Sequence, residues 1–193
     1  IRAMKDSGDR ITEISKSLRT FSRADTDIKQ AFNLHEGIDS TVLILRHRLK
    51  ANEQRPEIAV IRDYGNIPKI DCFPGQLNQV FMNILANAID ALDEVSQQRS
   101  FEEMKAHPHC ITIRTAVDNH QVTVAIADNG PGISEKIRAK IFDHLFTTKG
   151  VGKGTGLGLA ISRQIVVEAH SGTLEVQSEL GQGTEFCIRL PIG

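Results

Sequence analysis

Apolar side chains recur at helical spacing in four segments of the chain, which predicts four main helices. The first, residues 1–24, carries a narrow heptad seam that suits a helix of a bundle, although a helix packed on its own domain has the same pattern. The third begins at Pro74, whose missing N–H needs no partner in a first turn. The fourth runs from about Leu157 to His170. The faces of the second and third comprise Ile38, Val42, Leu45 and Leu49, and then Leu77, Val80, Phe81, Ile84, Leu85, Ala88, Leu92 and Val95.

Period-two alternation predicts the strands. Residues 57–65 read as a strand and residues 67–72 as a short extended piece. Residues 110–117 and 121–128 form a predicted antiparallel hairpin, and residues 173–178 pair with residues 184–190 across the turn ELGQG. The order of helices and strands predicts an α+β fold, a two-layer α/β sandwich in which helices cover one face of a mixed sheet, preceded by one bundle-type helix.

Composition limits the function classes. We expect the bundle-type helix in residues 1–24, a polar linker in 25–30 and one domain in 31–193. The net charge of −1 gives no attraction to nucleic acid or to a membrane surface. The three cysteines form no metal-ligand or disulfide pattern, so reduced thiols in a cytoplasmic protein are expected.

Residues 146–160, FTTKGVGKGTGLGLA, place five glycines immediately before the fourth helix. A phosphate suits such a position, because the first turn of a helix offers unpaired N–H donors. The spacing matches neither a P-loop nor a G-x-G-x-x-G fingerprint. Glycine content alone leaves a simple surface loop as the alternative.

Polar residues of two other segments suggest nucleotide chemistry. Asn83 and Asn87 are four residues apart, so they share one face of the long helix. An amide oxygen there could coordinate a hard cation such as Mg²⁺, or the amides could simply cap a neighbouring loop. Asp128 ends a predicted strand and precedes Asn-Gly-Pro-Gly. This stretch has two interpretations. It is a plain turn, or the Asp128 carboxylate accepts from the amino group of a base while the glycines make room for the ring.

Five segments, taken in order, resemble the N, G1, F, G2 and G3 boxes of two-component sensor histidine kinases. The ATP-binding domain of that family shares the Bergerat (GHKL) fold with gyrase, a large heat-shock chaperone and mismatch-repair ATPases. Residues 10–23, RITEISKSLRTFSR, are similar to the second helix of the family's dimerization and phosphotransfer hairpin. The five matching segments are Asn83–Ala91, Asp128–Ile133, Phe142–Lys149, Gly152–Gly158 and Gly183–Thr184.

This resemblance implies roles for individual residues. Asn87 would hold Mg²⁺ on the ATP phosphates, while Asn83 and Lys149 would serve catalysis. Asp128 would read adenine with help from Thr184, and the glycine-rich segment would form the lid over the phosphates. The residues expected to bind ATP are Asn83, Asn87, Asp90, Asp128, Gly130, Gly132, Ile133, Phe142, Phe146, Thr147, Thr148, Lys149, Gly152, Gly154, Thr155, Gly156, Leu157, Gly158 and Thr184.

The sequence leaves two alternatives to a kinase. A water-splitting ATPase of the same fold needs a Glu where Asn83 stands, and an amide cannot act as a general base. Asp90, by contrast, favours the ATPases, because many histidine kinases carry a basic or neutral residue at the corresponding position. A nucleotide-binding partner module that has lost kinase activity is the second alternative, and the intact boxes argue against it.

The resemblance also implies partners. None of the seven histidines lies in the family's H-E/D-x-x-x-P acceptor context, so the phosphoacceptor is expected on a hairpin domain outside this chain. Further expected partners are ATP, a downstream response regulator and, in the full-length protein, a second copy of itself. Neither nucleic acid nor a membrane is expected to contact this fragment, although its parent could be membrane-anchored.

Overall fold

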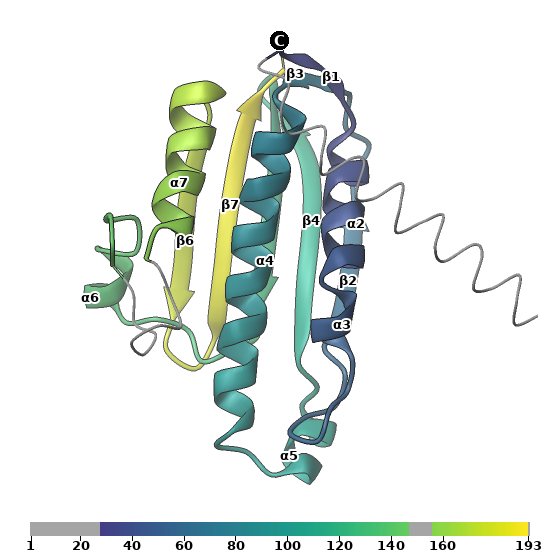
Figure 1. Cartoon of the computed structure of the whole chain (residues 1–193), viewed down its shortest axis with the longest axis vertical. Coiled ribbons are helices and arrows are strands. Elements are labelled where there is room, and N and C mark those ends of the chain that lie inside the picture. The colour runs from purple at the N-terminus through teal and green to yellow at the C-terminus, as the bar shows by residue number, and fades with distance from the viewer. Residues whose placement is uncertain (1–27, 147–155, 193) are drawn as a thin grey trace, which may run out of the picture.

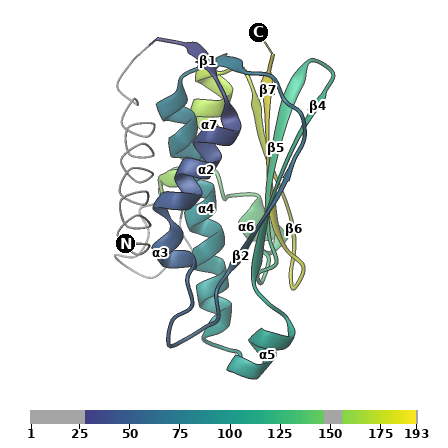
Figure 2. The same cartoon turned by 90° about the vertical axis from the view of Figure 1, so that its right-hand side faces the viewer.

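The computed structural model describes residues 28–146 and 156–192, whose elements form two layers (Figures 1 and 2). One layer is a five-stranded sheet, and the main helices lie side by side on one of its faces. The predicted α+β sandwich is therefore confirmed. The predicted helix in residues 1–24 and the start of the predicted linker lie outside the described residues.

The sheet has the order β2-β4-β5-β7-β6. β2 is parallel to β4, and the other neighbouring strands are antiparallel, so the sheet is mixed as predicted. Both predicted hairpins are confirmed, and the tight turn of the first is made by Asn119 and His120, which both have positive φ. The strands are β2 (Ala59–Tyr64), β4 (Cys110–Asp118), β5 (Gln121–Asp128), β6 (Thr173–Glu179) and β7 (Gly183–Pro191).

The helical layer follows the apolar faces read from the sequence. The predicted second helix consists of α2 (Leu34–Ile44) and the short α3 (Arg46–Leu49), and all four of its predicted face residues are buried. The long helix α4 (Pro74–Ser96) begins at Pro74 as predicted. The predicted fourth helix is α7 (Gly158–Gln164), which continues into a π-helical turn, Ile165–Ala169.

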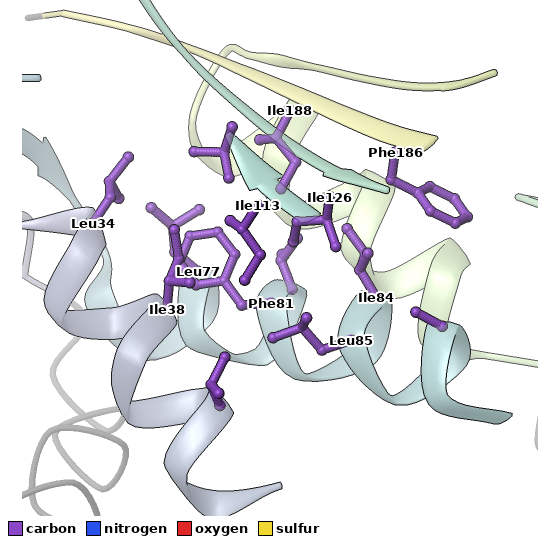
Figure 3. Packing of buried hydrophobic residues seen from close by; sticks show 14 of the residues in the cluster. Leu34, Ile38, Leu77, Phe81, Ile84, Leu85, Ile113, Ile126, Phe186 and Ile188 are labelled. Atoms are coloured by element: carbon purple, nitrogen blue, oxygen red, sulfur yellow. The ribbon is translucent and has the colours of Figure 1, made fainter. Parts of the chain in front are cut away.

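The core lies between α4, α2 and the inner face of the sheet (Figure 3). Phe81 of α4, fully buried, packs beneath Ile113 of β4 and Ile126 of β5, which are at most 1% exposed. Phe186 continues the inner row onto β7. Burial of this apolar area is the main stabilising term of the fold, and it fixes where the ends of β5, β6 and β7 lie.

Short elements at the ends of the layers were harder to predict. β1 (Gln30–Phe32) and β3 (Ile70–Cys72) form a separate antiparallel pair. The sequence predicts an extended segment at residues 67–72 but neither β1 nor this pairing. α5 (Phe101–Ala106) begins with a capping box of Ser100 and Glu103. α6 (Glu135–Arg138) is a single turn capped by Ser134.

His170 joins the end of the π-helical turn to the start of α4. The Phe73 N–H donates to His170 Nε2 at 3.0 Å, and His170 Nδ1 lies 2.9 Å from the Ile165 carbonyl oxygen. The ring is therefore neutral, with its proton on Nδ1, and burial lowers the pKa of His170. This buried histidine therefore forms a structural link between the two elements.

None of the described helices combines the length and the apolar character that a membrane crossing requires.

Candidate nucleotide-binding site

Three polar side chains form a row across the inner face of the sheet. Asp128 of β5 lies opposite Thr184 of β7, which lies opposite Ser178 of β6. The next row inward on this face is apolar and contains Ile126 and Val176, two residues earlier on β5 and β6, and Phe186, two residues later on the antiparallel β7. Side chains two apart on a strand share a face, so the three polar groups point toward the helical layer at the end of the sheet.

Asp128 is a buried carboxyl group with an unusual acidity. It is 9% exposed, and burial raises its pKa to about 6, although main-chain N–H groups of Gly130 and Thr184 oppose the rise. The Gly130 N–H donates to Asp128 Oδ1 at 2.9 Å. A buried carboxylate needs a donor partner, and the exocyclic amine of a base supplies one.

Glycines allow the loop after β5 to lie directly against the β6–β7 turn. Gly132 has φ +67°, and a Cβ there would lie 2.0 Å from the Glu179 carbonyl oxygen. A Cβ at Gly183 would lie 2.0 Å from the Asp128 carbonyl oxygen. The Gly181 N–H also donates to the Pro131 carbonyl oxygen at 2.7 Å. Only glycine allows this approach at Gly132 and Gly183, and it places Gly130, Gly132 and Ile133 beside Asp128 and Thr184.

Ser178 is a residue of this site that sequence reasoning missed. Its hydroxyl accepts from the Ile133 N–H at 2.9 Å, donates to the Gly183 carbonyl oxygen at 2.7 Å and lies 3.0 Å from Thr184 Oγ1. A single side chain thus joins β6, the loop after β5 and the start of β7. The sequence carries only a weak signal for this role of Ser178. The alternation of β6 puts Ser178 on the same face as the apolar Leu174 and Val176.

On the helical side, Asn83 contacts the start of α7. Asn83 Nδ2 donates to the Gly158 carbonyl oxygen at 2.9 Å and to Ser162 Oγ at 3.1 Å. Asn87 lies one turn further along α4, on the same side of the helix. Toward the C-terminal end of α4, Ala91 and Leu92 lie against Gly130, so this helix contacts both parts of the site.

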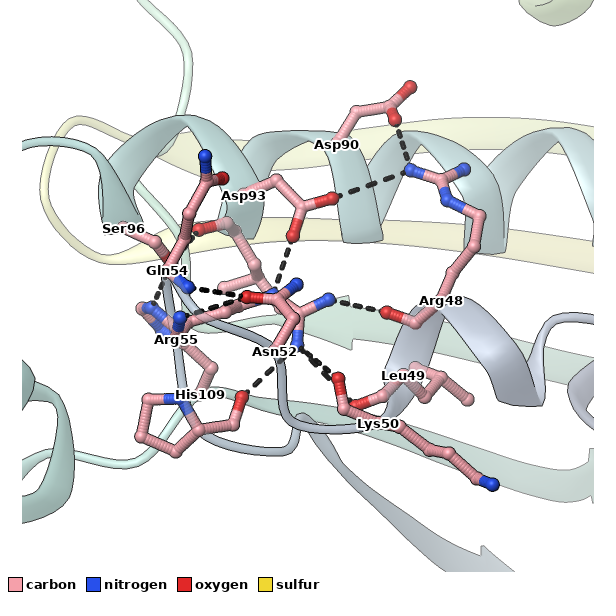
Figure 4. A network of polar contacts seen from close by, with 12 residues as sticks. Arg48, Leu49, Lys50, Asn52, Gln54, Arg55, Asp90, Asp93, Ser96 and His109 are labelled. Carbon is pink, nitrogen blue, oxygen red and sulfur yellow. Dashed lines mark hydrogen bonds and ion pairs between the residues drawn. The ribbon is translucent and has the colours of Figure 1, made fainter.

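Asp90 lies in a network of charges between α3 and α4 (Figure 4). Arg48 Nη2 lies 2.5 Å from Asp90 Oδ1 and 3.5 Å from Asp93 Oδ2. Arg55, 1% exposed, lies 2.5 Å from Asp93 and donates to the carbonyl oxygens of Arg48, Leu49, Lys50 and Pro56. The expected phosphate-side residue Asp90 is thus ion-paired with Arg48.

The predicted lid is described only at its two ends. Phe142 packs edge-to-face with Phe186, with ring centroids 6.4 Å apart, and the Arg163 guanidinium lies over the Phe142 ring, 5.6 Å from its centroid. Phe146 is half-buried, and Leu145 beside it lies against Gly156, where a Cβ would lie 2.5 Å from the Leu145 carbonyl carbon. The two ends therefore meet. Thr147, Thr148, Lys149, Gly152, Gly154 and Thr155 lie outside the described residues.

Comparison with known proteins agrees with this geometry. Residues 73–193, more than half of the chain, match the family model described as histidine kinase-, DNA gyrase B-, and HSP90-like ATPase. Sporulation kinase E of Bacillus subtilis is 35% identical over 79% of this chain and 18% of its own length. The sensor kinase CckA of Brucella abortus is 33% identical over 99% of this chain and 20% of its own length. The chain thus spans about a fifth of these relatives.

Solved structures show the same fold. The catalytic domain of histidine kinase ThkA, in a nucleotide-free form, superposes with a TM-score of 0.68 at 26% identity, covering 85% of this chain and 95% of that chain. The kinase ShkA in complex with AMPPNP superposes equally well at 24% identity, over all of this chain and 38% of that chain. The chain therefore belongs to the family of histidine kinase-, DNA gyrase B- and HSP90-like ATPases, and it contains the ATP-binding catalytic domain of a sensor histidine kinase.

Proposed function

We propose that this chain binds MgATP and transfers the γ-phosphoryl group to a histidine on a two-helix hairpin, for relay to a response regulator. The observation that carries the proposal is the hydrogen bonding of the Asn83 side-chain amide. An ATPase that splits water needs a general base, whereas the Asn83 amide is a donor committed to Gly158 and Ser162. The nearby carboxylate of Asp90 is paired with Arg48. An incoming imidazole needs no such base, because its nitrogen is itself the nucleophile.

Adenine recognition is assigned to the buried row at the end of the sheet. The Asp128 carboxylate would accept from the exocyclic amine, with Thr184 beside it on the neighbouring strand. Gly130, Gly132 and Ile133 form the adjoining wall of the base pocket. The expected phosphate end lies toward Asn83, Asn87, Leu157 and Gly158, where α4 meets α7.

The residues present suit a magnesium ion held jointly with the nucleotide. Among the described residues, no group of three or more His, Cys, Asp or Glu side chains could hold a metal alone. Mg²⁺ binds few protein oxygens and keeps phosphate oxygens and waters as further ligands, so the amide oxygen of Asn87 is a fitting donor. The ion would neutralise charge on the phosphates, while α4 fixes where Asn87 lies.

The partners follow from the reaction. The phosphoryl acceptor is a hairpin histidine outside this chain, and the full-length protein is proposed to be a homodimer. ThkA, whose catalytic domain is similar to this one, forms a complex with the response regulator TrrA, which supports a regulator as the next acceptor. We place the reaction in the cytoplasm, which supplies ATP and suits the three free thiols Cys72, Cys110 and Cys187.

The experiment supplies the hairpin of the same kinase together with Mg²⁺ and ATP labelled on the γ-phosphate. We expect label on the hairpin histidine, lost with Asn87→Ala and retained with Gln79→Ala, an exposed position on the same helix. A chain that binds ATP but never labels the hairpin would be a nucleotide-binding module and would contradict the proposal.

A further inference from the structure

The hydrogen atoms around Ser178 can be assigned from its three partners. The Gly183 carbonyl oxygen can only accept, so Ser178 must donate its one hydroxyl proton to it. The Ile133 N–H can only donate, so it uses a lone pair of Ser178 Oγ. In the remaining contact, at 3.0 Å, Thr184 must therefore be the donor and Ser178 Oγ the acceptor.

This assignment has a consequence for the neighbouring base pocket. The Thr184 proton points along the sheet toward β6, away from Asp128 on β5. Thr184 Oγ1 then has only lone pairs to offer on its other side. The Asp128 carboxylate is also an acceptor when ionised, and its main-chain donors already occupy part of it. The polar end of the pocket consequently presents acceptors from both side chains.

We propose that Ser178 is a specificity-determining positioning residue: by holding the Thr184 proton, it makes the base pocket selective for a donor, such as an exocyclic amine or a water that donates. A base with a carbonyl group at that position would meet two acceptors, with no hydroxyl free to turn and donate. The inference rests on the proposed assignment of Asp128 to the base, but it concerns a residue outside the five boxes.

A purely structural role for Ser178 predicts a different result. Removing the hydroxyl leaves the Ile133 N–H and the Gly183 carbonyl oxygen without this partner, which would loosen the pocket for every nucleotide alike. The positioning role instead changes the ratio of affinities for two nucleotides that differ only in the base. ATP and inosine triphosphate form such a pair, because ribose and phosphates are the same while a carbonyl with a neighbouring N1–H replaces the exocyclic amine and its neighbouring N1 acceptor.

The test measures binding of ATP and inosine triphosphate by calorimetry for the wild type, Ser178→Ala, Ser178→Cys and Ser178→Thr. We expect the wild type to prefer ATP. The preference should shrink about three- to tenfold in Ser178→Ala, because Thr184 can then rotate and donate to the carbonyl. Ser178→Thr keeps a hydroxyl and should keep the preference. Ser178→Cys fills the same space with a weaker hydrogen-bonding group and should lose the preference for ATP. This variant serves as the test if the alanine variant does not fold.

The outcomes distinguish the role of Ser178 from the assignment of Asp128 to the base. Equal loss of both nucleotides in Ser178→Ala, with the ratio unchanged, would overturn the role of Ser178 while leaving the assignment of Asp128 intact. A wild type that binds ATP and inosine triphosphate equally would instead contradict the assignment of Asp128 itself.

Discussion

Asn83 of α4 donates to the Gly158 carbonyl oxygen at 2.9 Å and thereby holds the first residue of α7 against the long helix. Ser162 completes the contact, since its hydroxyl also donates to Gly158 O at 2.8 Å while it accepts from Asn83. A residue predicted to act near the phosphates thus also forms a hydrogen-bonded link between the two helices. The Asn83 amide thus helps to hold the start of α7 against α4.

Asn83→Asp should destabilise the protein more than Asn83→Ala. A carboxylate would face the Gly158 carbonyl oxygen without a proton to give, so the loss should be about 1–3 kcal/mol in the free energy of unfolding. The alanine variant leaves Ser162 bonded to Gly158 and should lose less. Urea denaturation measures both, and an Asp variant as stable as the wild type would show that the link is unimportant.

Gly132→Ala should harm both folding and ATP binding, and Gly181→Ala is its matched control. Both glycines have positive φ, +67° and +80°, so alanine carries a similar backbone penalty of about 1–2 kcal/mol at each. At Gly132 the new methyl group also meets the Glu179 carbonyl oxygen at 2.0 Å, whereas nothing lies within 4 Å at Gly181. Thermal unfolding and ATP titration should separate the two variants, and equal losses would argue against a tight contact between the loop and the turn.

The buried Asp128 should make stability depend on pH in a defined direction. Its pKa is about 6 in the folded state against an ordinary value of 3.8, so the folded protein binds this proton more tightly than the unfolded chain. The free energy of unfolding should therefore fall as the pH rises from about 4 to about 6, by up to about 3 kcal/mol from this group. Asp128→Asn should abolish that part of the dependence and, without nucleotide, be more stable than the wild type at pH 7.

The same titration should appear in nucleotide selectivity. Below about pH 6 the protonated Asp128 can donate to a carbonyl group, so the preference for ATP over inosine triphosphate should shrink. Because the two nucleotides carry the same phosphates, protonation of the phosphates cancels in the ratio. A preference that stays constant from pH 5 to pH 8 would argue that Asp128 does not contact the base.

Arg55→Lys should be strongly destabilising although it keeps the charge. The buried Arg55 guanidinium donates to Asp93 and to four carbonyl oxygens around the end of α3. A lysine has three donors on one atom and cannot reach this set, so a loss of about 2 kcal/mol or more is expected. Arg46→Lys on the exposed side of α3 is the control. Similar stability of both variants in urea would contradict the role of Arg55.

The sequence allowed the main sheet and the long helices to be predicted because their periodicities extend over many residues and their turns carry Gly, Asn or Asp. β1 and β3 have three residues each and pair across about 40 positions, so no local period reveals them. Asp128 and Thr184 could be identified from box motifs. Ser178 could not, because a lone serine becomes informative only when the register sets it beside Thr184. Arg48 and Asp90 likewise meet only through the packing of α3 on α4.

The most direct test of the central claim follows where the γ-phosphate goes. The chain is incubated with labelled ATP, Mg²⁺ and the acceptor hairpin, and phosphohistidine and free phosphate are counted in the same samples over time. The account predicts that label accumulates on the hairpin histidine, with very slow release of phosphate when the hairpin is left out. Rapid ATP hydrolysis by the unmodified chain alone, or stable label on one of its own seven histidines, would contradict the account and favour the water-splitting ATPase.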